Sequence, residues 1–379
     1  MGVRVTRALT HGGNIHAAAR MLGVGIGDIL DLSASINPLG MPRCVQTALR
    51  KGLTEAVHYP DPAAAELTAA LANYHSVPPE TLLCGNGSTE LIYLIAQALR
   101  PTAALIPAPT FAEYERAVTA CRKSDARSVK HSISYFPLKE KTGFRIDPDG
   151  FIDAMANMVS TLPLRHPRQS ALPVAFLCNP NNPTGVGTPR EDVLKIARAA
   201  RKLRCYLVVD EAFVDFCPQH SVIDAVAGNP CLIVLRSMTK FYALAGIRLG
   251  YGIFPGSVVR RILSIREPWT VSTIAQIAGL SALQDASYRA KTAQMLAREK
   301  LFLEKAFRTF GIEHLPSEAN YYLLKMRDAE TIAAGLAQKG ILLRRCVNIS
   351  GLTRSHLRVA VRTRSENIRF LKELNACRD

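Results

Sequence analysis

The sequence predicts an α/β protein, in which a mostly parallel sheet is covered by helices on both faces and is followed by a smaller α+β unit. Three observations predict this class. Between about residues 46 and 280, short apolar runs alternate with segments of helical periodicity, a pattern typical of parallel strands buried on both faces. After about residue 280, one long polar-apolar helical segment precedes two further apolar runs. The length of 379 residues is sufficient for two or three units with cores of their own.

The first segment, residues 1–45, is punctuated by Gly and Pro and contains one short helical stretch, Ile15–Leu22. We expect this segment to pack against the small domain and the active site.

The large domain is expected to span residues 46–280. Two helices are predicted at Glu90–Leu99 and Arg190–Leu203; in the second, apolar residues recur at helical spacing. The stretch Phe151–Pro173 is expected to form a helix followed by an exposed loop. The predicted strands are Thr81–Cys84, Ala103–Ile106, Val174–Cys178, Cys205–Val209, Leu232–Leu235 and Leu249–Ile253.

The small domain is expected to span residues 281–379. It begins with a long helix, roughly Ala286–Phe310, and continues with strands at Tyr321–Lys325 and Leu357–Val361 with flanking helices.

Charge and cysteine content limit the possible partners and compartment. The chain has 47 Lys and Arg against 31 Asp and Glu, a net charge of +16, which favours nucleic acid, an anionic membrane or an acidic small substrate. No two of the nine cysteines lie closer than twelve positions, which excludes CxxC metal and redox motifs and gives no disulfide framework. We therefore predict no metal site and a reduced, cytoplasmic protein. Because no apolar run approaches the length of a membrane span and no signal-peptide pattern is present, we expect no membrane partner.

Three motifs follow predicted strands, where open α/β sheets bind their ligands. The first, Asn179-Pro180-Asn181-Asn182-Pro183-Thr184-Gly185, presents Asn amides on a rigid turn, although such a string also occurs in ordinary turns. The second places Asp210 and Glu211 at a strand end, where an acidic residue can equally be a cap or an ion-pair partner. The third carries Ser237, Lys240 and Arg248. Apolar neighbours around Lys240 would lower its pKa and favour Schiff-base chemistry, whereas most lysines are simply solvated.

In this order, the three motifs resemble those of fold-type I pyridoxal-phosphate enzymes, the class I and II aminotransferase superfamily, over essentially the whole chain. The resemblance implies the fold-type I architecture with pyridoxal 5'-phosphate bound by the large domain. It implies that Lys240 attaches the cofactor aldehyde, that Asp210 pairs with the pyridine nitrogen, and that Asn182 binds the 3'-oxygen.

Further cofactor contacts follow from a Gly-rich turn and from the same resemblance. Gly85-Asn86-Gly87-Ser88-Thr89 opens a helix after a strand, and small residues there let backbone N–H groups reach an anion. With Ser237 and Arg248, the residues Gly87, Ser88 and Thr89 are expected to hold the cofactor phosphate. Two aromatic residues complete the expected set: Tyr59 from a neighbouring subunit, which implies a homodimer with a shared active site, and Phe111 stacked on the ring.

The N-terminal motifs indicate a branch of the family. His11-Gly12-Gly13-Asn14 and Asp31-Leu32-Ser33-Ala34-Ser35-Ile36-Asn37-Pro38-Leu39-Gly40 resemble the threonine-phosphate decarboxylase branch of cobalamin biosynthesis. That branch converts L-threonine O-3-phosphate to (R)-1-amino-2-propanol O-2-phosphate and CO2. A substrate with a carboxylate and a phosphate needs two anion sites, for which Arg is suited. The expected substrate residues are His11, Gly12, Asn37, Asn182, Arg344 and Arg358.

Several alternatives remain open from the sequence. Arg344 and Arg358 are each expected to bind one substrate anion, in either assignment. The same cofactor residues would run transamination if the Cα–H bond rather than the Cα–carboxylate bond lay perpendicular to the ring, so a histidinol-phosphate-type aminotransferase is the alternative. We expect no nucleic-acid partner, because basic clusters such as Arg201-Lys202-Leu203-Arg204 are short and lie on predicted helix faces.

Overall fold

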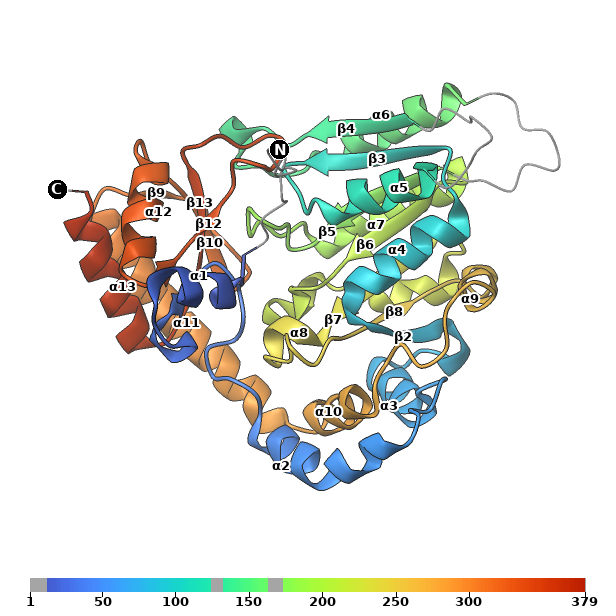
Figure 1. Ribbon diagram of the computed structural model, residues 1–379. Helices are drawn as coiled ribbons and strands as arrows, with labels where there is room; N and C mark the ends of the chain where they lie inside the picture. Colours follow the sequence, from blue (N-terminus) through green and yellow to red (C-terminus); the bar gives the residue numbers. More distant parts are fainter. Residues whose placement is uncertain (1–11, 124–131, 163–172, 379) are drawn as a thin grey trace, which may run out of the picture.

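The computed structural model describes residues 12–123, 132–162 and 173–378. At its centre is a seven-stranded sheet with the order β2-β8-β7-β6-β5-β3-β4 (Figure 1). Strand β8 is antiparallel to β2 and β7, and all other neighbours are parallel. The strands are β2 (Leu82–Asn86), β3 (Ala103–Ala108), β4 (Ser132–Pro137), β5 (Val174–Cys178), β6 (Tyr206–Asp210), β7 (Leu232–Ser237) and β8 (Leu249–Ile253). The predicted α/β class with a mostly parallel sheet is confirmed.

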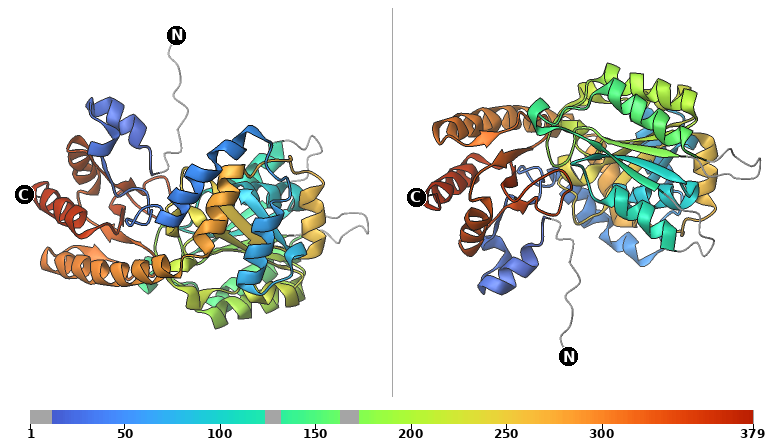
Figure 2. Two further views of the ribbon diagram at one scale, coloured as in Figure 1. Left: turned by 90° about the horizontal axis from the view of Figure 1, so that it is seen from below. Right: turned by 90° about the horizontal axis from the view of Figure 1, so that it is seen from above.

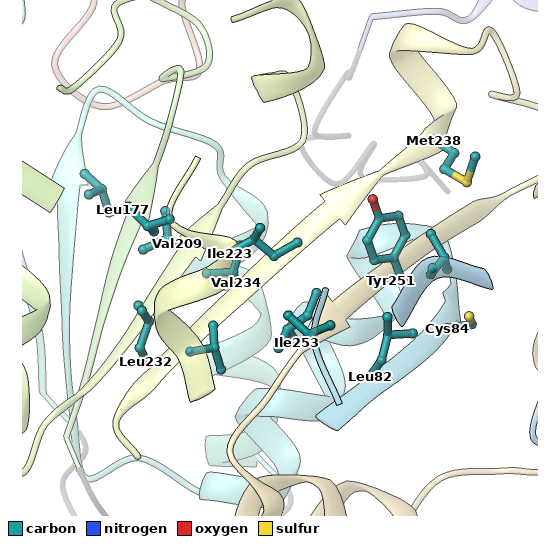
Figure 3. Packing of buried hydrophobic residues seen from close by; sticks show 14 of the residues in the cluster. Leu82, Cys84, Leu177, Val209, Ile223, Leu232, Val234, Met238, Tyr251 and Ile253 are labelled. Carbon is teal, nitrogen blue, oxygen red and sulfur yellow. The ribbon is translucent and has the colours of Figure 1, made fainter. Parts of the chain in front are cut away.

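Side chains alternate between two cores, one on each face of this sheet. Leu177 and Val209 point into one core, whereas their neighbours Phe176 and Val208 point into the other, as the two-residue period of a strand requires. Figure 2 shows the sheet between two helix layers, and Figure 3 shows the packing on the first face. Each fully buried Val or Leu contributes about 1.5–3 kcal/mol to folding.

The helices that cover the sheet divide between these two cores. The first core includes residues of α3 (Ala65–His75), α6 (Pro148–Ser160), α7 (Arg190–Leu203) and α10 (Thr273–Leu283), with α2 (Arg43–Gly52) packed on α10. The second core includes residues of α4 (Gly87–Leu99), α5 (Glu113–Lys123) and α9 (Gly256–Leu263). The short helix α8 (Met238–Phe241) directly follows the carboxyl end of β7.

A smaller unit follows the long helix α11 (Ala286–Thr309) and lies to the left in Figure 1. Its four-stranded antiparallel sheet has the order β12-β13-β10-β9. Its elements are β9 (Glu313–His314), β10 (Tyr321–Lys325), α12 (Ala329–Gln338), β11 (Ile341–Leu342), β12 (Arg344–Arg345), β13 (His356–Ala360) and α13 (Arg364–Ala376). The N-terminal strand β1 (Leu30–Asp31) pairs with β11, so the segment after helix α1 (Ile15–Leu22) is attached to this unit.

The predicted helices and strands agree with the structure in type and approximate position. The bounds of α1, α7, β5, β8 and β10 are as predicted, and the remaining predicted elements differ at their ends. The edge strand β4 was not predicted, because most of its side chains are exposed and give no continuous apolar run. The helix predicted from Phe151 begins at Pro148, and most of the loop predicted to follow it lies outside the described residues. In the part of the chain that the structure describes, no helix is both long and apolar enough to cross a membrane.

A buried ion cluster joins the ends of β6 and β7. Arg236 donates to Glu211 at 3.0 Å and also to Asp215, and Arg236 and Glu211 are both buried. Glu211 accepts two further hydrogen bonds, from the Ser221 hydroxyl and the Val222 N–H, both at 2.7 Å. Because Glu211 follows Asp210 and Arg236 precedes Ser237, this cluster holds the backbone of two predicted site segments.

Substituting Arg236→Met is expected to lower the free energy of unfolding by about 3–5 kcal/mol, because Glu211 would remain buried without its cation. Chemical denaturation of the purified variant measures this. The control is Lys195→Met, which breaks the exposed Lys195–Asp149 pair and is expected to cost less than about 1 kcal/mol. Equal effects of the two substitutions would contradict the importance of the buried cluster.

Candidate active site

A cavity of about 360 Å³ lies at the carboxyl ends of the parallel strands. Its walls come from the segments after β3, β5, β6 and β7, from the start of α4, from the segment after β1, and from β12 and β13. The fold therefore brings residues from both ends of the chain to the edge where open α/β sheets bind ligands.

Most of the predicted site residues line this cavity. They are Gly12, Ser88, Thr89, Phe111, Asn182, Asp210, Ser237, Lys240, Arg248, Arg344 and Arg358. Three other predicted residues, Gly87, Asn37 and Tyr59, are not among the lining residues, and His11 lies outside the described residues.

Gly87 lies beneath the guanidinium of Arg248 at the start of α4. Its φ is +75°, and a Cβ built there would lie 2.5 Å from Arg248 Nη2, so both the backbone conformation and the close approach require glycine. Ser88 and Thr89 occupy the first turn of α4, and the Ser237 hydroxyl bonds to Thr239 Oγ1 at 2.6 Å. The N–H groups of a helix start together with a nearby arginine suit a phosphate.

Asn37 is buried and its amide is bound by the protein. Its Nδ2 donates to the Phe241 carbonyl and to Thr292 Oγ1, both at 2.8 Å, and its backbone N–H donates to the Lys240 carbonyl at 3.0 Å. In this arrangement Asn37 holds the backbone of α8, which carries Lys240, rather than facing the cavity.

Tyr59 is 81% exposed, and its ring centroid lies 4.7 Å from that of Trp269. A second cavity, lined in part by Thr89, Arg248 and Trp269, lies beside the start of α4. Tyr59 is thus near the start of α4, although its own ring is outside the main cavity.

Lys240 is flanked by positive charge. Burial, and then the charges of Arg358 and Arg248, lower the pKa of Lys240 from 10.5 to about 8. A substantial fraction of the amine is consequently neutral near physiological pH, the form that attacks a carbonyl carbon.

Asp210 is buried at the end of β6. Burial raises the pKa of its carboxyl group, and hydrogen bonds from the Tyr114 hydroxyl and the Ala212 N–H oppose this rise. These bonds measure 2.7 Å to Oδ2 and 3.1 Å to Oδ1. Both oxygens are held by the protein while the side chain still lines the cavity.

Arg344 and Arg358 form a pair on neighbouring strands. They are directly opposite in the antiparallel register of β12 and β13, so their side chains leave the same face of the sheet. Arg358 donates to Asn182 Oδ1 at 2.5 Å and to the Ser33 carbonyl at 2.7 Å, and its Nε is buried with no hydrogen-bond partner among the described residues. No carboxylate of a described residue lies within 4.0 Å of Arg358. Burial, and to a smaller extent Arg358, lower the pKa of Arg344.

The sequence reasoning did not find several residues of the cavity. Ser35 lines it with a buried hydroxyl that has no partner among the described residues, and Glu113 and Arg116 form an ion pair at its wall. Tyr114, which binds Asp210, was also missed. Its hydrogen bond to Asp210 joins residues 96 positions apart, so no local pattern in the sequence indicates it.

One group of potential metal ligands lies outside the cavity. Ligand atoms of Cys217, His220 and Glu318 lie within 4.8 Å of one another, with no ion present. His220 Nε2 lies 2.5 Å from Glu318 Oε2. Burial raises the pKa of the Cys217 thiol, and the positive charge of nearby Lys300 opposes this rise. A nearby ammonium group opposes binding of a cation, and we assign no function to this group.

With this geometry established, comparison with known proteins decides the family. Residues 27–374 match the family model for aminotransferase class I and II. The chain belongs to this family. Threonine-phosphate decarboxylase from Salmonella typhimurium is 37% identical over 96% of this chain and 95% of its own length. Histidinol-phosphate aminotransferase from Nitratidesulfovibrio vulgaris is 31% identical over 94% of this chain and 89% of its own length.

A solved structure supports the same fold. The histidinol-phosphate aminotransferase from Sinorhizobium meliloti, determined in complex with pyridoxal-5'-phosphate, has a TM-score of 0.82. It is 22% identical, and the match covers 100% of this aminotransferase-family chain and 98% of that one. The expected fold-type I architecture is thereby confirmed.

The lowered pKa of Lys240 is measurable without any ligand. In competitive acetylation followed by mass spectrometry, the reactivity of Lys240 is expected to rise with pH to a midpoint near 8, with exposed Lys305 as reference for the reagent. Arg358→Ala removes a repelling charge, so the midpoint is expected to move to higher pH. A midpoint for the unmodified protein near the ordinary lysine value, about 10.4, would contradict this environment.

Proposed function

We propose that this chain is a pyridoxal-phosphate-dependent decarboxylase that converts L-threonine O-3-phosphate to (R)-1-amino-2-propanol O-2-phosphate and CO2 in cobalamin biosynthesis. The observation that carries the proposal is the opposed pair Arg344 and Arg358 at the wall of a cavity that also holds Lys240 and Asp210. The relative that is 37% identical and bears the name of this activity supports it.

The residues of the cavity fit this cofactor. The start of α4, Ser237 and Arg248 offer N–H, hydroxyl and guanidinium donors for its phosphate. Asp210 would face the ring nitrogen, Asn182 the 3'-oxygen and Phe111 the ring face, and Lys240 would attach the aldehyde. When bound, the cofactor supplies an electron sink for bonds at the substrate α-carbon. Lys240, with a pKa of about 8, is suited to return a proton to that carbon.

We assign the guanidinium groups of both Arg344 and Arg358 to the substrate phosphate. This replaces the expectation from the sequence that each arginine binds a different substrate anion. Two cations side by side on one sheet face repel each other, and a phosphate dianion between them would neutralise both and offer bidentate acceptors. The reaction itself adds a reason. The phosphate keeps its charge throughout, whereas the carboxylate loses its charge as CO2 leaves. A tight ion pair with the carboxylate would therefore stabilise the ground state more than the transition state.

We further propose a cytoplasmic homodimer. Around Tyr59, the side chains of Leu53, Val57 and Trp269 are exposed, and a second copy covering them would bring this tyrosine to the phosphate end of a shared site. None of the nine cysteines, all of which lie in the described residues, forms a disulfide bond, which suits a reducing compartment. Sedimentation velocity measures whether the mass is that of two chains.

The substrate assignment is tested directly. With pyridoxal phosphate and L-threonine O-3-phosphate, the purified protein is expected to release CO2 and form aminopropanol phosphate, identified by mass spectrometry. Lys240→Ala is expected to lose both this activity and the visible absorbance of the lysine-bound cofactor. If CO2 is absent and histidinol phosphate instead supports amino transfer to 2-oxoglutarate, the chain is a histidinol-phosphate aminotransferase, the alternative suggested by the 31% identical relative.

The arginine pair has a test of its own. Arg344→Ala and Arg358→Ala are each expected to raise KM for L-threonine O-3-phosphate by about 100-fold or more, because each removes charge-assisted hydrogen bonds to a dianion. Arg345→Ala is the matched control, since Arg345 is the next residue, is exposed and pairs with Glu330. If inhibition by inorganic phosphate is unchanged in both pair variants, the phosphate is bound elsewhere.

A further inference from the structure

Tyr114 is the side chain that holds Asp210 from behind the cavity wall. It lies in α5, is fully buried, and donates its hydroxyl to Asp210 Oδ2 at 2.7 Å. Its ring stacks on Phe176 with centroids 5.0 Å apart and planes 11° apart. Its edge also contacts Phe111, with centroids 5.7 Å apart and an interplanar angle of 81°. One rigid side chain thus contacts two residues assigned to the cofactor ring.

The phenol is a permanent donor. Burial, and then the negative charge of Asp210, raise the pKa of Tyr114 well above its usual value, so the hydroxyl keeps its proton at any working pH. The hydrogen bond therefore always runs from Tyr114 to the carboxylate.

The other titratable groups that act on Asp210 come from three further elements. They are Cys178 of β5, Lys240 of α8 and Tyr321 of β10. Burial raises the pKa of Cys178 to about 12 and the pKa of Tyr321 far above its usual range, so both are neutral. Among the described residues, Tyr114 is accordingly the side chain that donates a hydrogen bond to this carboxylate, and its own charge does not change with pH.

We propose that Tyr114 is a positioning residue that lowers the proton affinity of the Asp210 carboxylate, so that the proton shared with the cofactor lies on the ring nitrogen. A donor to a carboxylate stabilises its charged form, and a hydrogen bond to a charged group is worth about 1.5–3 kcal/mol, at least tenfold in an equilibrium. Without the donor, the proton would shift toward Asp210 and the ring would become a weaker electron sink. This inference rests on the proposed cofactor but not on the proposed substrate.

The test uses the holoenzyme loaded with pyridoxal phosphate labelled with ¹⁵N in the ring. Solid-state NMR of the unsubstituted enzyme is expected to give a protonated ring nitrogen. In Tyr114→Phe the signal is expected to move toward the neutral pyridine value, with kcat lowered about tenfold or more and KM little changed. Tyr322→Phe is the matched control, since Tyr322 is also a fully buried tyrosine that donates to a carboxylate, Glu304 at 2.6 Å, outside the cavity.

A ring-nitrogen signal in Tyr114→Phe identical to that of Tyr322→Phe would overturn the inference. If Tyr114→Phe does not fold, 3-fluorotyrosine at position 114 keeps the shape and strengthens the donor. The pH at which the ring-nitrogen signal moves to the neutral pyridine value is then expected to rise, and an unchanged or lower pH also overturns the inference. A protein that binds the cofactor but does not decarboxylate threonine phosphate would refute the substrate alone. Failure to bind the cofactor would refute both.

Discussion

The buried pairing of Arg236 with Glu211 and Asp215 is the constraint on which the site geometry depends. It joins the ends of two parallel strands one residue away from Asp210 on one side and Ser237 on the other. The Glu211 N–H also donates to the Leu235 carbonyl at 2.8 Å. Because a buried ion pair that loses one member leaves an uncompensated charge, these two strand ends cannot separate without a large loss of stability. The relative positions of Asp210 and the Lys240 helix are set by this contact.

The second organising feature is a concentration of positive charge in one cavity. Lys240, Arg248, Arg344 and Arg358 all line it, and burial together with repulsion from neighbouring arginines lowers the pKa values of Lys240 and Arg344. Repulsion of this kind disfavours the empty site and favours anions of matching charge. A phosphorylated cofactor and a phosphorylated substrate would together supply negative charge that offsets this repulsion. These four residues are a small part of the 47 Lys and Arg, so the net charge indicated an anionic partner but not its size.

Sequence reasoning succeeded where one local pattern is sufficient and failed where two distant segments meet. Strands β5 and β8 had predictable bounds because continuous apolar runs mark burial on both faces, whereas β4 lacks such a run. The residues predicted to bind the cofactor follow strand ends and belong to compact motifs. By contrast, the hydrogen bonds of Asn37 reach Phe241 and Thr292, more than 200 positions away, and no pattern near Asn37 in the sequence indicates them.

The sequence by itself therefore determined the fold class, the family and which residue types gather at the strand ends, because each of these depends on periodicity or on short motifs. Only the tertiary structure decided how the charges are arranged. The opposition of Arg344 and Arg358 depends on the register of β12 with β13, and the hydrogen bond from Tyr114 to Asp210 joins α5 to β6 across 96 positions. Register and helix docking result from packing of the whole core, so a single sequence carries no local signal for them.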